Sequence, residues 1–493
     1  MHIAKLEPDA FAGLSDRQLL RTEAFVGGEW LAALDDATFP VHNPYDGSLI
    51  ARVSSLGAAD SRHAVDAAAA AFEQWKTILP QGRSLLLRRW FELIVAARED
   101  LALIMTLEQG KPLDESRGEI DYAASFVEWY AEEAKRLGAE AVVSHLEATQ
   151  TFVTRQPLGV AALFTPWNFP SAMLTRKAAA AMAAGCTVAA HVASHTPLSA
   201  LALAELAQRA GLPSGVFNVL TGDASVIGEV LTSDPRVRVV SFTGSTEIGR
   251  LIMAQCAPTL KRLVMELGGL APLIIFDDAD IERAVAVAMD AKFATSGQDC
   301  LAANCIYVQR ALYERFCEAF ARRVKELTLG DGLKPGTDIG PLMHEAAVEK
   351  AARHVDDALA RGARLLAGGS PTGDGLFVAP TVLADVADSA MIMREETFTP
   401  IAAVTPFETE AEVLRRANDT EYGLVAYVVT KDGARALRMA RALDFGMIAI
   451  NRVKITGAPI PFGGVKQSGV GREGSRHGIE AFTDLKYICQ DLA

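Results

Sequence analysis

Regular alternation between strand-like and helix-like segments is the feature that most restricts the fold of this chain. Between residues 160 and 256, short β-branched runs are separated by segments whose apolar residues recur at helical spacing. The strand-like runs are VAALFTP (160–166), TVAAHV (187–192), VFNVLTG (216–222) and VRVVSFTG (237–244). Because helical crossovers connect parallel strands, this alternation predicts an α/β domain built on a parallel sheet.

A second alternating series follows Glu266. Its strand-like runs are PLIIF (272–276), NCIYVQ (304–309), VAPTVL (378–383), IAAVTPF (401–407) and GLVAYVVT (423–430), and its helical segments include 281–293 and a long run over 312–330. At 493 residues the chain exceeds what a single hydrophobic core normally supports. We therefore expect a second α/β domain.

Other segments belong to neither series. Residues 60 to 136 are Ala-rich with helical periodicity and predict covering helices. Residues 139–160 and the tail 481–493 alternate apolar and polar positions, which indicates an extended hairpin and a strand that pairs elsewhere.

Charge and cysteine usage narrow the possible partners. The chain has 48 Lys and Arg against 61 Asp and Glu, a formal net charge of −13. This balance argues against nucleic acid or an anionic membrane as a main partner and favours a small-molecule enzyme. The six cysteines lack paired spacing, so we expect neither disulfides nor a metal site. No segment resembles a signal peptide or a membrane span, and we expect a cytoplasmic protein.

Five short motifs occur in a fixed order along the chain. They are TPWNFP (165–170), SFTGSTEIG (241–249), MELGG (265–269), SGQDC (296–300) and EETF (395–398). In this order and spacing they resemble the aldehyde dehydrogenase superfamily. The resemblance runs from EAFVGGEW (23–30) to PFGGVKQSGVGREGSRHGIEAF (461–482), and within the superfamily the chain is most similar to succinate-semialdehyde dehydrogenases.

The resemblance implies an aldehyde dehydrogenase-like α/β fold with a Rossmann-type cofactor domain, an α/β catalytic domain and a β oligomerisation arm. We assign residues 1–138 and 157–265 to the cofactor domain and 266–457 to the catalytic domain. Residues 139–156 and 478–493 would form the arm, and 458–477 a segment that returns to the cofactor domain. The arm would pair between subunits of a homodimer or homotetramer.

The resemblance also implies a catalytic set of Cys300, Glu266, Asn168 and Lys177. An aldehyde carbon must become tetrahedral before it can give up a hydride, and a cysteine thiolate suits that addition. Cys300 would add to the carbonyl and be left as a thioester. The Asn168 amide and the Cys300 backbone N–H would stabilise the oxyanion, Glu266 would activate water, and Lys177 would assist proton transfer or contact the cofactor. For Cys300 alone, an inert buried cysteine is the competing interpretation.

No GxGxxG motif follows an early strand, so the usual dinucleotide fingerprint is absent. FTGSTEIG takes its place, because a strand runs into Gly244 and Ser245 and a helix starts there, with free N–H groups for a pyrophosphate. The resemblance extends the expected cofactor set to Thr165, Pro166, Trp167, His191, Ser194, Gly244, Ser245, Gly268, Glu396 and Phe398. His191 stands where relatives carry a lysine and Ser194 where NAD-preferring relatives carry a glutamate, so NAD and NADP both remain open.

The expected substrate residues are Phe169, Met173, Arg176, Asp299, Cys305 and Thr456. Succinate-semialdehyde dehydrogenases bind the distal carboxylate with two arginines; Arg176 matches one of them, and we expect Cys305 at the place of the second. Asp299 beside the nucleophile would repel an anion. We therefore expect a neutral, apolar or aromatic aldehyde. The alternatives are a succinate-semialdehyde or aminoaldehyde dehydrogenase, or a non-catalytic descendant, and Leu270 and Thr399 also depart from the family pattern.

Overall fold

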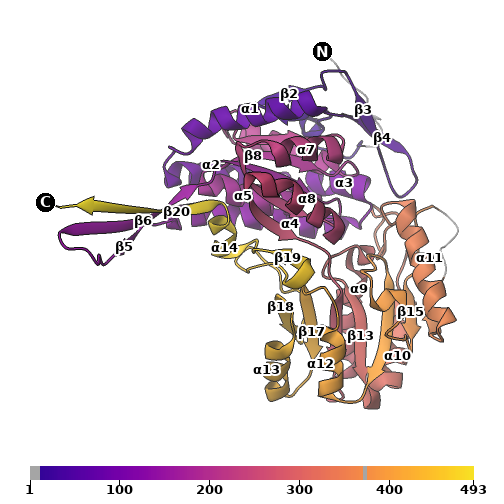
Figure 1. Cartoon of the computed structure of the whole chain (residues 1–493). Helices are drawn as coiled ribbons and strands as arrows, with labels where there is room; N and C mark the ends of the chain where they lie inside the picture. Colours follow the sequence, from indigo (N-terminus) through magenta and orange to yellow (C-terminus); the bar gives the residue numbers. More distant parts are fainter. Residues whose placement is uncertain (1–10, 370–374, 493) are drawn as a thin grey trace.

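The computed structural model describes residues 11–369 and 375–492. Residues 1–10, 370–374 and 493, which fall in the predicted cofactor domain, catalytic domain and arm, lie outside the described residues. Two α/β bodies meet along one boundary, and a β arm projects from the first body (Figure 1). Each body is built on its own sheet, as the two alternating series predicted.

Eight described strands form the first sheet, in the spatial order β19-β11-β10-β7-β8-β9-β1-β2. The strands from β11 to β9 are parallel, which confirms the expected βα series, whereas β1, β2 and β19 join the edges antiparallel. The strands are β1 (Ala24–Val26), β2 (Glu29–Leu31), β7 (Val160–Thr165), β8 (Thr187–Val192), β9 (Phe217–Leu220), β10 (Val237–Thr243), β11 (Arg262–Glu266) and β19 (Gly469–Val470).

Alternate side chains of β7 enter different cores. Ala161 and Leu163 pack on one face of the sheet with the Ala-rich α5, whereas Ala162 and Phe164 pack on the other face with α1, α7 and α8. Every residue of α5 is buried, and the charged Arg176 and Lys177 within it are paired with Glu473. The helices of this body are α1 (Ala58–Trp75), α2 (Pro80–Ala96), α3 (Arg98–Gln109), α4 (Leu113–Glu133), α5 (Pro170–Ala184), α6 (Pro197–Arg209), α7 (Ala224–Ser233) and α8 (Thr246–Cys256).

Seven described strands form the second sheet, in the order β14-β15-β16-β13-β12-β17-β18, with only β14 antiparallel to its neighbour. The strands are β12 (Ala271–Ile275), β13 (Ala303–Gln309), β14 (Arg364–Ala367), β15 (Thr381–Ala384), β16 (Ile401–Phe407), β17 (Val425–Val429) and β18 (Met447–Ile450). The helices are α9 (Ile281–Phe293), α10 (Arg310–Val324), α11 (Glu345–Ala360), α12 (Glu410–Asn418) and α13 (Gly433–Ala442).

The arm is a separate antiparallel sheet in the order β20-β6-β5. Its strands are β5 (Glu140–Val142), β6 (Thr149–Pro157) and β20 (Thr483–Asp491), and the short helix α14 (Ser475–Glu480) leads into β20. The hairpin β3 (Thr38–His42) and β4 (Leu49–Ser54) completes the described strands. The hairpin pairs with the tail within this chain, and the expected pairing between subunits stays a prediction.

The remaining general expectations concern the membrane and the domain limits. Among the described helices, none combines the length and the apolar character that crossing a bilayer requires. The domain limits and the cytoplasmic location stay predictions.

Candidate active site

A cavity of about 350 Å³ lies where the two bodies meet. The carboxyl ends of β7, β10 and β11 reach it from the first sheet, and the segments that precede β13 and β16 reach it from the second. Ligands of open α/β sheets bind at such a carboxyl edge. The lining residues are Tyr122, Pro166, Trp167, Asn168, Phe169, Met173, Arg176, Thr243, Gly244, Ser245, Glu266, Leu267, Gly268, Asp299, Cys300, Leu301, Glu396, Phe398, Thr456 and Phe462.

Cys300 reaches the cavity from a tight turn after α9. Thr295, Ser296 and Gly297 all have positive φ there, and a Cβ on Gly297 would lie 2.4 Å from the Thr399 carbonyl oxygen. Glu115 of α4 accepts the Thr295 N–H at 2.9 Å and so fixes the turn from the first body. Burial and, next, the nearby Glu266 carboxylate raise the pKa of the Cys300 thiol, so ionisation of this thiol needs a base.

Asn168 follows β7 and is buried at the cavity wall. Its side-chain amide donates to the Gln298 carbonyl at 2.9 Å, two residues before Cys300. Lys111 holds the backbone at this point, because its ammonium donates to the Asn168 carbonyl at 2.7 Å and pairs with Glu119. The Asn168 amide is therefore fixed beside the cysteine turn.

Glu266 is the last residue of β11 and only 2% exposed. Its Oε1 has no hydrogen-bond partner among the described residues. Burial raises the pKa of Glu266 to about 8. A buried, unpartnered carboxylate that shares a cavity with a thiol has the character of a general base.

Three charged side chains form a buried cluster behind the cavity. Arg176 Nε pairs with Glu473 Oε2 at 2.6 Å, and Lys177 contacts both the other Glu473 oxygen and Thr243 Oγ1, the latter at 2.7 Å. Burial disfavours ionisation of Glu473, but its two cationic partners outweigh this and lower its pKa. Arg176 Nη1 is buried without a partner among the described residues, although the arginine lines the cavity.

The opposite wall carries features suited to a dinucleotide. Ser245 caps α8, with its Oγ accepting the Ile248 N–H at 3.3 Å, so the free N–H groups of that helix start face the cavity edge. Glu396 Oε1 accepts the Gly269 N–H at 3.0 Å, and burial raises the pKa of Glu396 to about 7. The Phe398 ring contacts Trp167 edge-on, with ring centroids 5.8 Å apart.

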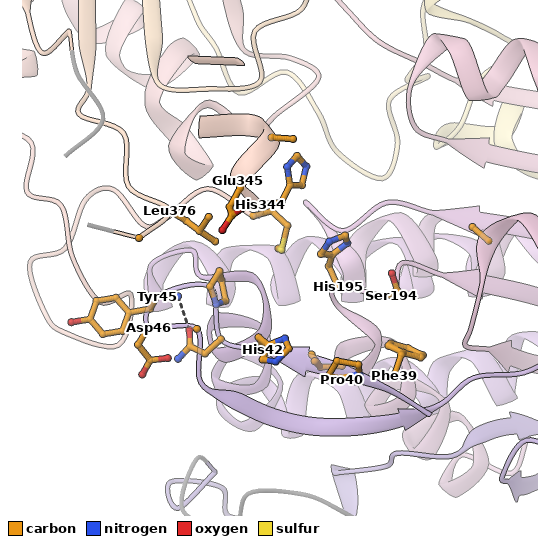
Figure 2. Close-up of a pocket in the computed structure, with 18 of the residues that line it drawn as sticks. Phe39, Pro40, His42, Tyr45, Asp46, Ser194, His195, His344, Glu345 and Leu376 are labelled. Carbon is orange, nitrogen blue, oxygen red and sulfur yellow. Dashed lines mark hydrogen bonds between the residues drawn. The ribbon is translucent and has the colours of Figure 1, made fainter. Parts of the chain in front are cut away.

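A second, larger cleft of about 1510 Å³ lies further along the same edge, beyond β8 and β9 (Figure 2). Ser194 lines it, together with His42, His195 and His344. A row of contacting rings runs from the smaller cavity to this cleft, in the order Phe398, Trp167, His344 and His195. The centroids of successive rings lie 5.8, 6.1 and 6.0 Å apart. The two sites therefore lie next to each other at the boundary of the bodies.

A family model described as the aldehyde dehydrogenase family matches residues 30–488. The chain belongs to the aldehyde dehydrogenase family. This finding confirms the resemblance, the fold class and the expectation of an NAD(P)-dependent enzyme that oxidises an aldehyde.

Two characterised aldehyde dehydrogenases and one solved structure illustrate the similarity. The succinate-semialdehyde dehydrogenase [NADP(+)] GabD of Escherichia coli is 50% identical, over 97% of this chain and 100% of that protein. The glutarate-semialdehyde dehydrogenase of Pseudomonas putida is 49% identical, over 97% and 99%. An aldehyde dehydrogenase structure from Brucella melitensis superposes with a TM-score of 0.97 at 51% identity, over 98% and 99%.

Most sequence-predicted site residues of this aldehyde dehydrogenase gather at the two neighbouring sites. Four of them line neither. Thr165 and Lys177 are buried behind the smaller cavity, and His191 lies beneath the cleft, where its Nε2 is 3.2 Å from the Gly222 carbonyl oxygen. Buried contacts with strand and helix partners keep these side chains from the ligand space.

Cys305 is the fourth, and its placement corrects the substrate argument. It lies within β13 among the side chains packed on the other side of that sheet, with its Sγ 3.9 Å from the Met393 carbonyl oxygen. It lines a different small pocket, with Arg394, Arg415 and Arg416. Cys305 therefore cannot hold the place of a substrate-binding arginine, and the expected neutral aldehyde loses part of its support.

The sequence reasoning missed several residues of this site. Glu473, Tyr122, Phe462, His195 and His344 all line it or support it, from segments far apart in the sequence. The motif GREGS contains Glu473, and that motif was the one available signal for it.

Proposed function

We propose that this aldehyde dehydrogenase oxidises a semialdehyde, an aldehyde with a carboxylate at its far end, through a thioester on Cys300. The observation that carries the substrate class is the buried Arg176, whose Nη1 lacks a partner at the cavity wall. A carboxylate is the partner that a buried guanidinium binds best. The Escherichia coli and Pseudomonas putida relatives carry the names of semialdehyde enzymes, which supports the same class.

In the first step, the Cys300 sulfur adds to the aldehyde carbon after its proton has passed to a base. The oxyanion that forms is stabilised by an Asn168 amide N–H and the backbone N–H of Cys300. The Gln298 carbonyl and Lys111 hold Asn168 in position for this role. These fixed donors need no reorganisation when the charge develops.

When bound, the NAD(P) nicotinamide accepts the hydride that the tetrahedral carbon releases. The start of α8 at Ser245, the Glu396 carboxylate and the Phe398 ring are the residues that would hold the cofactor. They fit it, because Gly268 leaves the space between them open: a Cβ there would lie 3.2 Å from Glu396 Oε2.

Loss of the hydride leaves the acyl group on Cys300 as a thioester. Glu266 takes a proton from a water molecule, the water oxygen attacks the thioester carbon, and the carbon–sulfur bond breaks. The proton on Glu266 then passes to the departing Cys300 sulfur, so the products are the carboxylic acid and the free thiol. Burial of Glu266 keeps its basicity high enough for this step.

A panel of three aldehydes tests the proposal: succinate semialdehyde, butyraldehyde and 4-aminobutyraldehyde, followed by absorbance of the reduced cofactor. We expect the highest kcat/KM for succinate semialdehyde. Arg176→Gln should lower that value by about tenfold to a hundredfold more than it lowers the value for butyraldehyde, since only the semialdehyde loses a charge-assisted hydrogen bond. A wild-type preference for butyraldehyde would refute the substrate class.

A further inference from the structure

The larger cleft has an unusual set of charges for a site beside a nucleotide. Its described lining residues include the acidic Asp46, Asp223 and Glu345, but neither lysine nor arginine. The groups there that can acquire positive charge are His42, His195 and His344. Any positive charge in the lining therefore depends on an imidazole.

His344 and His195 approach each other across this cleft (Figure 2). His195 follows β8 in the first body, His344 is the N-cap of α11 in the second, and their ring centroids lie 6.0 Å apart. Ser194, which the family resemblance assigns to the cofactor site, directly precedes His195 and lines the same cleft. The two imidazoles thus flank the space beside Ser194 from opposite bodies.

Hydrogen bonding fixes the tautomer of His344. Its Nδ1 accepts the Ala347 N–H at 3.1 Å as the cap of α11. A nitrogen that accepts carries no proton, so the neutral ring holds its proton on Nε2 as a donor. Protonation on Nδ1 would remove the cap. Burial lowers the pKa of both His344 and His195, and for His195 the neighbouring His344 lowers it further.

We infer that this cleft selects NAD over NADP, and that His195 and His344 are the residues that decide the choice. The inference rests on the proposed cofactor placement. Neutral imidazole N–H groups match a ribose 2′-hydroxyl, which needs hydrogen bonds but no counter-charge. A 2′-phosphate brings about −1.5 to −2 charges. It would enter a cleft whose described lining contains Asp46, Asp223 and Glu345 but no lysine or arginine.

Titration of NADH and NADPH fluorescence tests the inference by binding alone. Wild-type protein should bind NADH at least about tenfold more tightly than NADPH. His195→Lys supplies a permanent cation and should shift the ratio toward NADPH by about tenfold or more, the effect of one charge-assisted hydrogen bond. His344→Asn keeps a side-chain oxygen for the α11 cap, but its N–H donor lies on a shorter side chain. This variant should weaken the binding of NADH more than the binding of NADPH.

His63→Lys is the matched control, because it adds the same charge on the exposed surface of α1, outside the described lining of the cleft. The ratio of its NADH affinity to its NADPH affinity should equal that of the wild type. Equal or tighter binding of NADPH by the wild type, or an unchanged ratio in His195→Lys, would overturn the inference. Failure of the proposed substrate class would show instead as normal cofactor binding without turnover of semialdehydes.

Discussion

At the scale of single residues, the active site crowds several acidic groups into one cavity. Burial raises the pKa of Cys300, Glu266, Asp299 and Glu396, and repulsion by neighbouring acidic groups adds to the effect at Cys300, Glu266 and Glu396. Arg176 opposes this effect at Cys300 and Glu266, and Lys177 also opposes it at Glu266. The cavity therefore disfavours ionisation of all its acidic groups at once. Protonation of one group changes the pKa of the others.

Glu266 should determine the pH dependence of thioester hydrolysis. The raised pKa of about 8 means that Glu266 is mostly protonated at pH 7, and only the ionised form can accept a proton from water. Hydrolysis should therefore accelerate by up to about tenfold per pH unit below 8 and level off above it. Glu266→Gln should give a stoichiometric burst of reduced cofactor followed by turnover about 10²–10⁴-fold slower, in rapid-mixing experiments. An unchanged steady-state rate in this variant would remove Glu266 from the mechanism.

Replacement of Cys300 by alanine should abolish aldehyde oxidation and leave cofactor binding intact, because only the nucleophile is removed. Turnover is measured by cofactor absorbance, and binding by fluorescence of the reduced cofactor. Cys489→Ala serves as the control, since this cysteine is exposed on the arm. Residual oxidation in Cys300→Ala at more than a trace level would contradict the thioester mechanism.

The motifs predicted which residues meet at the cavity, because each motif follows or precedes a strand at the shared boundary. The motifs could not predict which of these residues contact each other. Arg176 and Glu473 are far apart in the chain, and only the return of residues 458–477 to the first sheet brings them together. Cys305 failed for a different reason: alternation along β13 directs its side chain away from the cavity that Cys300 lines.

At the scale of elements, the start of α6 depends on one carboxylate. Glu108 of α3 is fully buried, and its two oxygens accept the N–H groups of Leu198 and Ser199, each at 2.7 Å. These are donors of the first turn of a helix, which have no partner within the helix. Glu108 thereby anchors the loop that carries Ser194 and His195 into the cleft.

Glu108→Ala should lower the free energy of unfolding by about 2–6 kcal/mol, because two buried N–H groups lose their acceptors at about 1–3 kcal/mol each. The shift of the denaturant midpoint measures the loss. Glu73→Ala is the control, because its ion pair with Lys76 is exposed and should contribute little. Equal midpoints for the two variants would show that other groups satisfy the α6 N–H groups.

Sequence patterns located most elements but not all of their ends. The run over 312–330 predicted a long helix, yet α10 ends at Val324. Beyond it, the Thr328 carbonyl accepts the Ile339 N–H and the Gly330 N–H donates to the Ile339 carbonyl, at 3.1 Å each. The periodicity of residues 312–330 cannot show that their last residues form backbone hydrogen bonds with Ile339 instead of continuing the helix.

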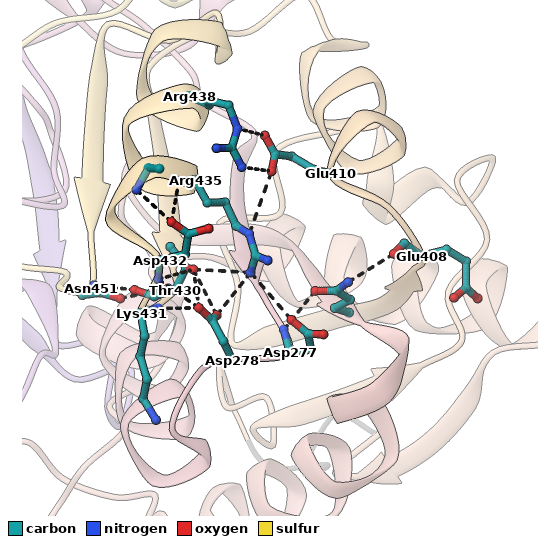
Figure 3. A network of polar contacts seen from close by, with 12 residues as sticks. Asp277, Asp278, Glu408, Glu410, Thr430, Lys431, Asp432, Arg435, Arg438 and Asn451 are labelled. Atoms are coloured by element: carbon teal, nitrogen blue, oxygen red, sulfur yellow. Dashed lines mark hydrogen bonds and ion pairs between the residues drawn. The ribbon is translucent and has the colours of Figure 1, made fainter.

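A network of hydrogen bonds and ion pairs lies at the end of the second sheet that is remote from the active site (Figure 3). Asp278, just after β12, accepts the Thr430 hydroxyl and the backbone N–H groups of Lys431 and Asp432, all within 3.0 Å. Arg435 of α13 joins it through ion pairs with Asp277 and Asp278. This end is the carboxyl edge of the second sheet, whereas the active site uses its amino edge. The network therefore stabilises the body without entering the reaction.

At the scale of the whole molecule, catalysis needs both bodies at once. The carboxyl edge of the first sheet supplies Asn168, Ser245 and Glu266, and the amino edge of the second supplies Cys300 and Glu396. Two alternating series in the sequence predicted two sheets. Their relative placement depends on contacts such as that of Glu115 with the cysteine turn, which no local pattern encodes.

The arm predicts an oligomer, because β20 leaves one edge unpaired among the described residues and carries exposed apolar side chains. Leu485, Tyr487 and Ile488 are 58%, 58% and 42% exposed. Such an edge pairs readily with another chain. Light scattering at micromolar concentration should therefore give two or four times the subunit mass of 52.6 kDa. Replacing Tyr487 and Ile488 together by lysine should reduce the mass at least twofold, since buried charge opposes the contact, whereas Lys486→Arg should leave it unchanged. A monomeric wild type would refute the prediction.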